Sequence, residues 1–325
     1  MTKYVISGYI GMDNFGDEAI CGILTGYLRQ NGAEEITVIS LNPEKTSRLY
    51  GVDSCGFLKF FKPIAETDVL ISGGGSLLQD VTSLKSLLYY LFVIVLALFL
   101  GKKVFIFAQG FTPFRTKTGE FLTTLILKKC HRISVRDKDS QEFLSRYGID
   151  SELVCDPVWS VSAPDILSKT GVGIQLRPSA ALSEDFLRAL SEEIAEIFPK
   201  EEIKLFSLQD SLDLPVLEKF APMLTAKGLG VKFRKSLSPA ETMNEISGLK
   251  YFIGMRFHSC LIAAKTGIKT LGINYDIKVK TLAQNTGFPY INPLSCEVNK
   301  GIQDLLKTEP EKYSMPEFRF PDIIP

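Results

Sequence analysis

The chain of 325 residues is longer than a typical single domain, and its 45% hydrophobic and 23% charged residues are ordinary for globular proteins. This composition excludes a disordered or fibrous chain and supplies apolar side chains for two cores in domains of about 150 residues each. With 37 basic and 37 acidic side chains the formal net charge is zero, which argues against a nucleic-acid partner.

The cysteines indicate a reducing compartment. All six are scattered without a C-x-x-C pair and are interpreted as buried thiols; they are Cys21, Cys55, Cys130, Cys155, Cys260 and Cys296. Because there are only two histidines and no cysteine cluster, no metal site is expected. The first residues lack the apolar stretch and cleavage site of a secretory signal, so we expect a cytoplasmic protein.

The first half of the chain alternates short β-rich runs with helix-length amphipathic stretches. Strands are predicted at 4–9, 36–41, 68–72, 103–108, 132–135 and 152–155, and helices at 17–30, 82–100, 118–129 and 138–147. Several strands are continuous apolar runs, as expected when both faces of a parallel sheet are covered. The alternation predicts βαβ units in a doubly wound sheet.

The same alternation restarts in the second half. Strands are predicted at 171–176, 203–208, 231–234, 251–254 and 270–274, and helices at 183–197, 215–227, 239–247, 259–266 and 278–286. Residues 156–169 contain two prolines and are interpreted as the linker, which gives an N-terminal domain at 1–157 and a C-terminal domain at 158–325. The tail after residue 308 holds four prolines and is predicted to be an irregular strap. The predicted fold class is α/β, with two Rossmann-like doubly wound domains facing a cleft.

A glycine-rich junction follows the first predicted strand. Its spacing of Gly8, Gly11 and Gly16 does not match the dinucleotide fingerprint, so a dinucleotide oxidoreductase is not favoured. Such glycines let backbone amides approach a ligand at a helix N-terminus. Asp17 stands where the loop meets the helix, either as the helix N-cap or as a general base facing a sugar hydroxyl. The two roles are compatible.

Two further glycine-containing junctions end predicted strands. Gly73, Gly74 and Gly75 are consecutive, which favours a close backbone approach to a ligand over a purely structural role. Asp80 lies just beyond them and is a second candidate base. Gln109 ends another strand, where it could bond a sugar hydroxyl or tie down its own loop.

Cationic side chains follow strands in both halves. Arg256 and His258 lie between a predicted strand and a helix; an arginine offers a bidentate fork for carboxylate or phosphate, and a histidine beside it can act as acid, base or cationic donor. Arg177 ends another strand of the second half. Arg136 has the same position in the first half, where it could instead pair with an acid. His131 begins a strand, at the opposite edge of the sheet, and is interpreted as structural.

Two segments carry alternative interpretations. Asp137-Lys138-Asp139 matches the D-x-D of metal-dependent sugar transferases, but it begins a predicted helix, so capping of the first turn is favoured. The uncharged run of fourteen residues from Leu87 to Leu100 is flanked by lysines. It is short for a membrane span, which leaves a core helix, the favoured interpretation, or a helix resting on the membrane surface.

Taken together, these residues resemble the polysaccharide pyruvyl transferase family, and within it the bacterial cell-surface-anchoring type. The matching segments occur in order from residue 7 to residue 279 and are SGYIGMDNFGDEAI, DVLISGGGSLLQDVTS, FAQG, SVRDKDS, GIQLRP, GMRFHSCLIAA and GINYDIKV. Each is weakly specific alone, whereas the ordered set is specific. The chain departs from the family in Phe111-Thr112-Pro113-Phe114, where a glycine usually precedes the proline, and this bears on the shape of the loop and on acceptor choice.

The resemblance implies a fold similar to the GT-B glycosyltransferases. It also implies phosphoenolpyruvate as donor, no cofactor, and a ketal product on two hydroxyls of one sugar. That sugar would belong to a cell-envelope polysaccharide or its lipid-linked precursor. A lipid-linked acceptor would give the run from Leu87 to Leu100 a place at the inner face of the plasma membrane.

The expected roles of the site residues follow from this chemistry. The anionic donor requires fixed cations, expected from Arg256, Arg177, His258 and Arg136. Ketal formation requires a general acid and a general base, with His258 as the acid or a phosphate clamp and Asp17 or Asp80 as the base. The sugar site is expected to include Asn14, Gly16, Gly73, Gly74, Gly75, Ser76 and Gln109. The alternatives are a nucleotide-sugar glycosyltransferase of the same architecture and a non-catalytic sugar- or anion-binding protein.

Overall fold

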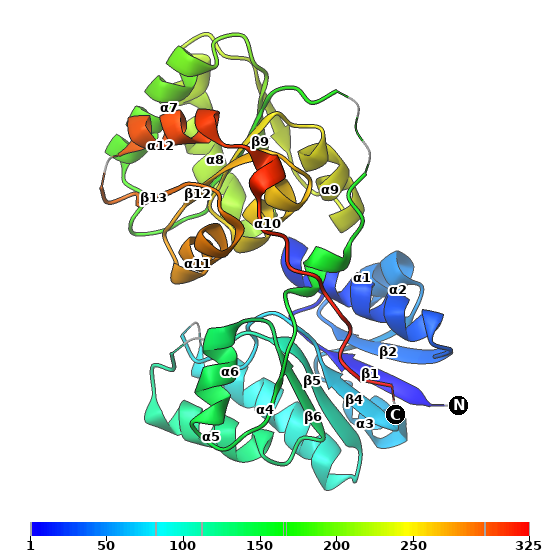
Figure 1. The fold of residues 1–325 in the computed structure, drawn as a ribbon. Helices are drawn as coiled ribbons and strands as arrows, with labels where there is room; N and C mark the ends of the chain where they lie inside the picture. Colours follow the sequence, from blue (N-terminus) through cyan, green and yellow to red (C-terminus); the bar gives the residue numbers. More distant parts are fainter. Residues whose placement is uncertain are drawn as a thin grey trace. The chain divides into compact units, whose positions relative to one another are not determined.

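A computed structural model of the chain describes residues 2–81, 83–111, 113–164, 166, 168–295 and 297–324. The chain divides into two compact units, one formed by Met1–Val161 with Glu317–Pro325 and the other by Ser162–Pro316 (Figure 1). Thr82, Thr112 and Cys296 lie outside the described residues, as do parts of the predicted linker.

Unit 1 is built on a seven-stranded parallel sheet of order β3-β2-β1-β4-β5-β6-β7. Its strands are β1 Lys3–Ser7, β2 Glu35–Ser40, β3 Asp53–Gly56, β4 Val69–Ser72, β5 Lys103–Gln109, β6 Arg132–Val135 and β7 Glu152–Leu153. Its helices are α1 Phe15–Gln30, α2 Pro43–Tyr50, α3 Phe61–Glu66, α4 Leu84–Phe99, α5 Lys117–Leu127 and α6 Lys138–Ser145, followed by the 3₁₀ turn η1 Pro157–Ser160. The strand order reverses between β1 and β4, which is where ligands bind in open α/β sheets.

Unit 2 repeats this plan on a six-stranded parallel sheet of order β10-β9-β8-β11-β12-β13. Its strands are β8 Val172–Gln175, β9 Ile203–Phe206, β10 Val231–Arg234, β11 Tyr251–Gly254, β12 Lys269–Ile273 and β13 Tyr290–Ile291. Its helices are α7 Glu184–Ile197, α8 Asp210–Thr225, α9 Pro239–Ser247, α10 Phe257–Lys265, α11 Ile277–Thr286 and α12 Val298–Lys307, with the 3₁₀ turn η2 Pro310–Lys312. Here the order reverses between β8 and β11.

The central strands are apolar because helices cover both faces of each sheet. All four residues of β4 are buried. In unit 1 the helices α3 to α6 share one core with one face of the sheet. In unit 2 the helices α7, α8 and α12 do the same.

Five elements were not predicted from the sequence, namely α2, β3, α3, β13 and α12. Four of them are short or polar, whereas α12 has ten residues and buries Val298, Ile302 and Leu305 on one side. Helix α2, with the sequence PEKTSRLY, buries only Thr46, so it has no apolar stripe to detect. Cys21 and Cys260 are buried as expected, whereas Cys55, Cys130 and Cys155 are only half-buried.

The C-terminal tail crosses back to unit 1. Phe320 stacks on Tyr27 of α1 with ring centroids 3.6 Å apart and lies 6.2 Å from Phe107 of β5. Asp322 pairs with Arg132 at 2.7 Å. The sequence-based division at 157/158 assigned this tail to the second domain; in the structure its aromatic contacts attach residues 317–325 to unit 1.

The apolar run from Leu87 to Leu100 lies within α4 and its C-cap, and its buried side faces the core of unit 1. Across the described residues, no helix combines the length and the apolar character needed to cross a bilayer.

Candidate functional site

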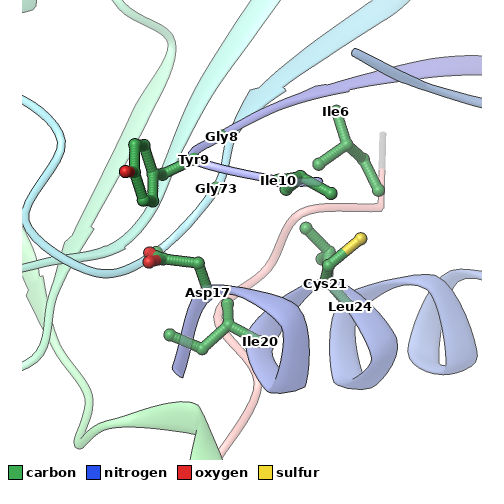
Figure 2. Close-up of a pocket in the computed structure, with 10 residues that line it drawn as sticks. Ile6, Gly8, Tyr9, Ile10, Asp17, Ile20, Cys21, Leu24 and Gly73 are labelled. Carbon is green, nitrogen blue, oxygen red and sulfur yellow. The ribbon is translucent and has the colours of Figure 1, made fainter. Parts of the chain in front are cut away.

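The candidate residues of unit 1 gather where β1, β4, β5 and β6 end. Gly73 follows β4, and its amide donates to the Ser7 carbonyl of β1 at 2.7 Å, so the first two glycine junctions lie side by side. Figure 2 shows Tyr9 and Asp17 beside Gly73. The cavity beneath these loops is about 10 Å³, room for a single water molecule, so the junctions are closely packed against α1.

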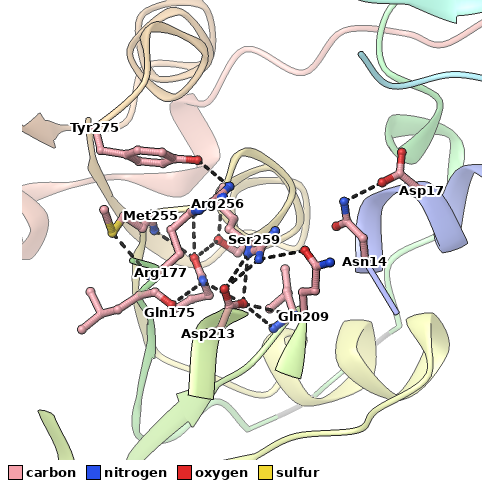
Figure 3. Close-up of polar contacts among 12 residues, drawn as sticks. Asn14, Asp17, Gln175, Arg177, Gln209, Asp213, Met255, Arg256, Ser259 and Tyr275 are labelled. Carbon is pink, nitrogen blue, oxygen red and sulfur yellow. Dashed lines mark hydrogen bonds and ion pairs between the residues drawn. The ribbon is translucent and has the colours of Figure 1, made fainter. Parts of the chain in front are cut away.

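Asp17 is the third residue of α1 and not its N-cap. The N-cap is Asn14, whose side-chain amide donates to the Asp17 carboxylate instead of capping the helix (Figure 3). The capping interpretation of Asp17 is therefore wrong. Its first-turn position keeps the carboxylate near the positive end of the helix dipole.

The glycine run approaches this carboxylate closely. Gly75 has φ +100°, and a Cβ atom at this position would lie 2.9 Å from Oδ1 of Asp17. The backbone conformation and the close approach both require glycine here. The neighbouring Glu18 has another task, since its carboxylate accepts from the Gly11 amide and from the Tyr50 hydroxyl, both at 2.7 Å. Glu18 thus fixes the first junction.

Gln109 ties the second and third junctions together. Its Nε2 donates to the carbonyls of Gly75 at 3.3 Å and Gly110 at 3.2 Å, while the Gly110 amide donates to the Gly75 carbonyl at 2.7 Å. Its Oε1 is buried and has no hydrogen-bond partner among the described residues. The loop-fixing role is therefore present, and one buried acceptor remains at the end of β5.

Tyr90 of α4 lies near Asp17. Burial raises the pKa of the Tyr90 hydroxyl, and the negative charge of the Asp17 carboxylate adds to the effect. The hydroxyl is therefore protonated at neutral pH and remains a hydrogen-bond donor. Tyr90 could not be singled out from the sequence, because it lies within the apolar run from Leu87 to Leu100.

Arg136 lies over the third junction. Its guanidinium donates to Asp156 at 2.9 Å and to the Ser76 hydroxyl at 3.0 Å, and its Nε would lie 2.6 Å from a Cβ atom on Gly110. The side chain is almost fully buried, as is Asp156. The pairing with an acid considered from the sequence is thus observed, and it holds a cation beside the glycine run.

Asp80 is occupied by the backbone around residue 115. Its Oδ1 accepts from the Arg115 amide at 2.7 Å, and its Oδ2 accepts from the amide and hydroxyl of Thr116 at 2.9 and 2.6 Å. Burial alone would raise the pKa of Asp80, but these hydrogen bonds outweigh burial and lower it. Asp80 therefore connects the loop after β4 to the start of α5.

In unit 2 the candidate residues gather where β8, β9, β11 and β12 end (Figure 3). Gln175 at the end of β8 accepts through Oε1 from the amides of Met255 and Arg256 at 3.2 and 2.7 Å. Gly254 permits this turn, because a Cβ atom there would lie 2.7 Å from Sγ of Cys260. These contacts fix the segment in which Arg256 stands.

Arg256 is buried and paired with Asp213 of α8. Its Nε donates to the carboxylate at 2.9 Å and its Nη2 at 2.7 Å, and Nη2 also reaches Oε1 of Gln209 at 3.3 Å. Nη1 makes no hydrogen bond within the part of the chain that the structure describes. The carboxylate in turn accepts from the amides of Leu208 and Gln209, so it fixes the guanidinium to the loop after β9.

Arg177 is the more accessible arginine. Its Nη1 donates to the Tyr275 hydroxyl at 2.9 Å, and its guanidinium lies 5.3 Å from the centroid of the same ring. Its Nε is buried without a hydrogen-bond partner among the residues described. Oδ1 of Asn274, next to Tyr275, is also buried without a hydrogen-bond partner in the described part of the chain. Buried polar atoms without a partner are uncommon in folded proteins, so these two atoms make this sheet edge a candidate ligand site.

His258 is the second residue of α10 and is half-buried, with its ring 5.1 Å from the Phe257 ring in an edge-on arrangement. Gly16 likewise is the second residue of α1. The sequence identified both from the strand–loop–helix pattern alone. His131 has the structural role expected, because its Nδ1 accepts from the Val104 amide at 3.2 Å. Asp137 caps α6 by accepting from the Ser140 amide, which confirms the capping interpretation.

Sequence reasoning missed the residues that orient the arginines, namely Asp213, Gln209, Gln175 and Tyr275. Gln175 and Tyr275 fall inside motifs that were recognised, GIQLRP and GINYDIKV. Asp213 gave no signal, because an acid in the first turn of a helix is ordinary. Its role depends on a contact across 43 residues of sequence.

Solved structures resemble the chain over almost its whole length. The Methanocaldococcus jannaschii UDP-GlcNAc 2-epimerase aligns over 98% of this chain and 96% of its own, with TM-score 0.67 and 11% identity. S. aureus MnaA, in a co-structure with UDP, aligns over 96% and 90%, with TM-score 0.69 and 9% identity. Anabaena Alr3699/HepE in complex with UDP and glucose aligns over 95% and 92%, with TM-score 0.59 and 12% identity. At these identities the likeness shows the fold alone, and it confirms the predicted class of two Rossmann-like domains of GT-B type.

The sequence comparison is more specific than the fold. The family model of the polysaccharide pyruvyl transferases matches residues 14–277, well over half of the chain. The chain therefore belongs to the polysaccharide pyruvyl transferase family. The match spans the site residues of both units from Asn14 to Tyr275. A comparison with curated proteins finds no significant match.

Proposed function

We propose that this enzyme transfers a pyruvyl group from phosphoenolpyruvate, as a ketal, onto one sugar of a cell-envelope polysaccharide or of its lipid-linked precursor. The proposal assigns it to the cell-surface-anchoring type, acting in the cytoplasm without a cofactor. Membership of the family supports pyruvyl transfer. The donor, the acceptor and the subtype are parts of the proposal.

The observation that carries the proposal is the set of cations at the carboxyl edge of the unit 2 sheet. Arg177, Arg256 and His258 follow β8 and β11, the strands between which the order reverses. Phosphoenolpyruvate carries a carboxylate and a phosphate, and fixed cationic donors match both groups. Asp213 occupies Nε and Nη2 of Arg256, so direct contact with the donor falls to its Nη1 and to Arg177 and His258.

In unit 1 the proposal assigns the sugar to the glycine junctions. Asp17 is the proposed base, because its carboxylate lies against the glycine run, whereas Asp80 accepts hydrogen bonds from the backbone around residue 115. Tyr90 is a protonated neighbour able to orient a sugar hydroxyl. The remaining proposed sugar contacts are Asn14, Gly16, Gly73, Gly74, Gly75, Ser76 and Gln109, with Arg136 as a nearby cation.

The proposed reaction balances without an added oxidant or reductant. A proton from His258 goes to the methylene carbon of phosphoenolpyruvate while a first sugar hydroxyl attacks the adjacent carbon and loses its proton to Asp17. A second hydroxyl then attacks the same carbon, the C–O bond to phosphate breaks, and hydrogen phosphate leaves with the second proton. The cations stabilise the charge that develops on the departing phosphate.

Acceptor-dependent release of inorganic phosphate from phosphoenolpyruvate tests the proposal. We expect phosphate and a pyruvylated saccharide in equal amounts when a lipid-linked saccharide is supplied. Phosphoenolpyruvate bound without phosphate release in the presence of acceptors would favour a non-catalytic binding protein.

Substitution of the cations tests their roles. Arg177→Ala and His258→Ala should each lower turnover by two or more orders of magnitude with folding intact, because each removes charge stabilisation or proton transfer. Arg188→Ala is the matched control, since Arg188 forms only an exposed pair with Glu184. Near-normal turnover in both site variants would exclude this assignment.

A nucleotide-sugar glycosyltransferase is the second candidate, because two of the similar structures are described as bound to UDP. Calorimetry separates the two candidates. The proposal expects phosphoenolpyruvate to bind and Arg177→Ala to abolish binding, whereas binding of a UDP-sugar with turnover, and none of phosphoenolpyruvate, favours the glycosyltransferase.

A further inference from the structure

The outer side of α4 is an exposed apolar stripe. Leu84, Leu88, Phe92, Val95 and Phe99 are spaced four, four, three and four residues apart, so they share one side of the helix. Their exposed fractions are 41%, 44%, 57%, 41% and 85%. A helix that only completed a core would show polar residues on this side.

The stripe extends onto the neighbouring helices. Helices α3, α4 and α5 cover the same face of the unit 1 sheet (Figure 1). On them Phe61 is 61% exposed, Phe121 62% and Leu125 48%. We call these three residues and the five of α4 the apolar face.

The apolar face is large for a surface that meets only water. An aromatic side chain presents roughly 150–250 Å² of surface, so Phe92, Phe99 and Phe121 alone expose on the order of 300–500 Å². Monomeric proteins rarely expose contiguous apolar patches beyond a few hundred Å², and larger ones mark contacts with proteins or membranes.

Basic residues surround the apolar face. Residues 84–129 contain seven lysines and arginines and one acid, although the charges of the whole chain balance. They stand at the ends of the helices and are Lys85, Lys102, Lys103, Arg115, Lys117, Lys128 and Lys129. The one acid, Glu120, accepts a hydrogen bond from Tyr147.

We propose that the apolar face rests on the surface of an anionic lipid bilayer, with its aromatic side chains at the level of the lipid headgroups. An interfacial helix buries its apolar side by about 5–10 Å, and lysines near anionic headgroups contribute on the order of 1 kcal/mol each. A second copy of the chain is a less favourable partner for the apolar face, because a two-fold contact would bring like-charged lysine clusters together.

The same helix links this surface to the sugar site. Tyr90, on the buried side of α4, lies near Asp17. If the proposed function holds, a saccharide tethered to the bilayer would be presented to the unit whose helix rests there. The lipid contact itself does not depend on that function.

Vesicle flotation tests the proposal with the intact chain and no substrate. The protein should float with phosphatidylglycerol-containing vesicles, less with pure phosphatidylcholine, and less as salt rises, because screening weakens the lysine contribution. Phe92→Ser/Phe99→Ser/Phe121→Ser should weaken binding at least tenfold, and Lys102→Glu/Lys103→Glu should remove the preference for anionic lipid. Leu294→Ser is the matched control, since Leu294 is an exposed leucine of unit 2.

Sedimentation and activity complete the test. No flotation of the wild type, or flotation that the phenylalanine variant retains, would overturn the proposal, as would a dimer that the same variant dissociates. Phosphate release with a lipid-free saccharide should be unchanged in the phenylalanine variant, while the KM for a lipid-linked acceptor rises. Phosphate release by a wild type that does not float would reject the membrane contact alone; absence of phosphate release with flotation intact would reject the proposed function alone.

Discussion

Arg256 and Asp213 form a buried ion pair that orients the Arg256 guanidinium more than it stabilises the fold. Removing two charges from water costs several kcal/mol each, and the pair offsets this only because the carboxylate also accepts two backbone amides. Such a pair is weak evidence for stability. It does set the direction in which the guanidinium points, and a cation that must meet a small anion needs that fixed direction.

Asp213→Ala leaves the guanidinium of Arg256 buried without its counter-ion. We expect unit 2 to lose roughly 3–5 kcal/mol of stability, seen as faster hydrogen exchange in α8 and β11 and a lower denaturation midpoint. Glu309→Ala breaks an exposed pair with Lys312 and should leave both observables unchanged. Equal exchange in the two variants would contradict the role given to Asp213.

Asp80 provides a pH-dependent contribution to the stability of unit 1. Its pKa is lowered in the folded chain, so its contribution is fully present above the unfolded value of about 4 and is lost as pH falls through the lower folded value. Asp80→Ala removes the acceptor for the Arg115 and Thr116 amides and should cost roughly 1–3 kcal/mol at pH 7. Thermal unfolding from pH 7 to pH 3 should show the gap between wild type and variant closing below about pH 4. A gap that stays constant across this range would show that ionisation of Asp80 is not involved.

Among the loops, the glycine run is the one in which backbone and chemistry depend on each other. Its third glycine has a left-handed backbone, lies against Asp17, and is hydrogen-bonded to the loop after β5 through Gly110. The close approach of Gly75 therefore helps to position the Asp17 carboxylate. A side chain at the third glycine would displace the proposed base.

Gly75→Ala should lower turnover at least tenfold with a smaller loss of stability, because the added Cβ atom displaces Asp17 and the alanine strains the left-handed backbone. Gly26→Ala is the control. Gly26 lies within α1 with open space at its Cβ position, so alanine there should stabilise the chain by about 0.5–1 kcal/mol and leave turnover intact. Phosphate release measures the turnover of both variants, and thermal unfolding measures their stability. If Gly75→Ala kept full turnover, the close approach would be incidental.

At the scale of the whole molecule, the last nine residues belong to the unit that the chain began with. Aromatic packing attaches them to unit 1: Phe318 and Phe320 contact Phe107, and Phe320 also stacks on Tyr27. Unit 1 is therefore complete only once the chain has passed through unit 2 and returned. This links the ordering of the tail to α1, the helix that carries Asp17.

Phe320→Ala should destabilise unit 1 by roughly 1–3 kcal/mol, because an aromatic stack is lost and part of Phe107 is uncovered. Met315→Ala, at an exposed residue just before the tail, is the control. Hydrogen exchange should accelerate in α1 and β5 of the first variant and nowhere in the control. Acceleration confined to unit 2 would refute the attachment of the tail.

Local sequence patterns were enough to predict the two α/β domains and where the candidate site residues lie along the chain. Alternation of apolar runs with amphipathic stretches is a local property, and glycines, Arg177, Arg256 and His258 at strand ends are visible without coordinates. Strand ends of a parallel sheet meet at one edge, so these residues could be grouped in advance. Short polar elements such as α2 left no periodic signal.

The hydrogen-bond partners of these side chains could be learned only from the three-dimensional structure. Asp80 and Asp17 are both acids after glycine loops, yet Asp80 accepts hydrogen bonds from backbone amides, whereas Asp17 accepts one from the Asn14 side chain and lies against a glycine. The pairing of Arg256 with Asp213 and the return of Phe320 to Tyr27 join residues far apart in the chain. Such pairings leave no trace in local pattern, because hydrogen bonds and packing depend on distance in space, and a single sequence does not record that distance.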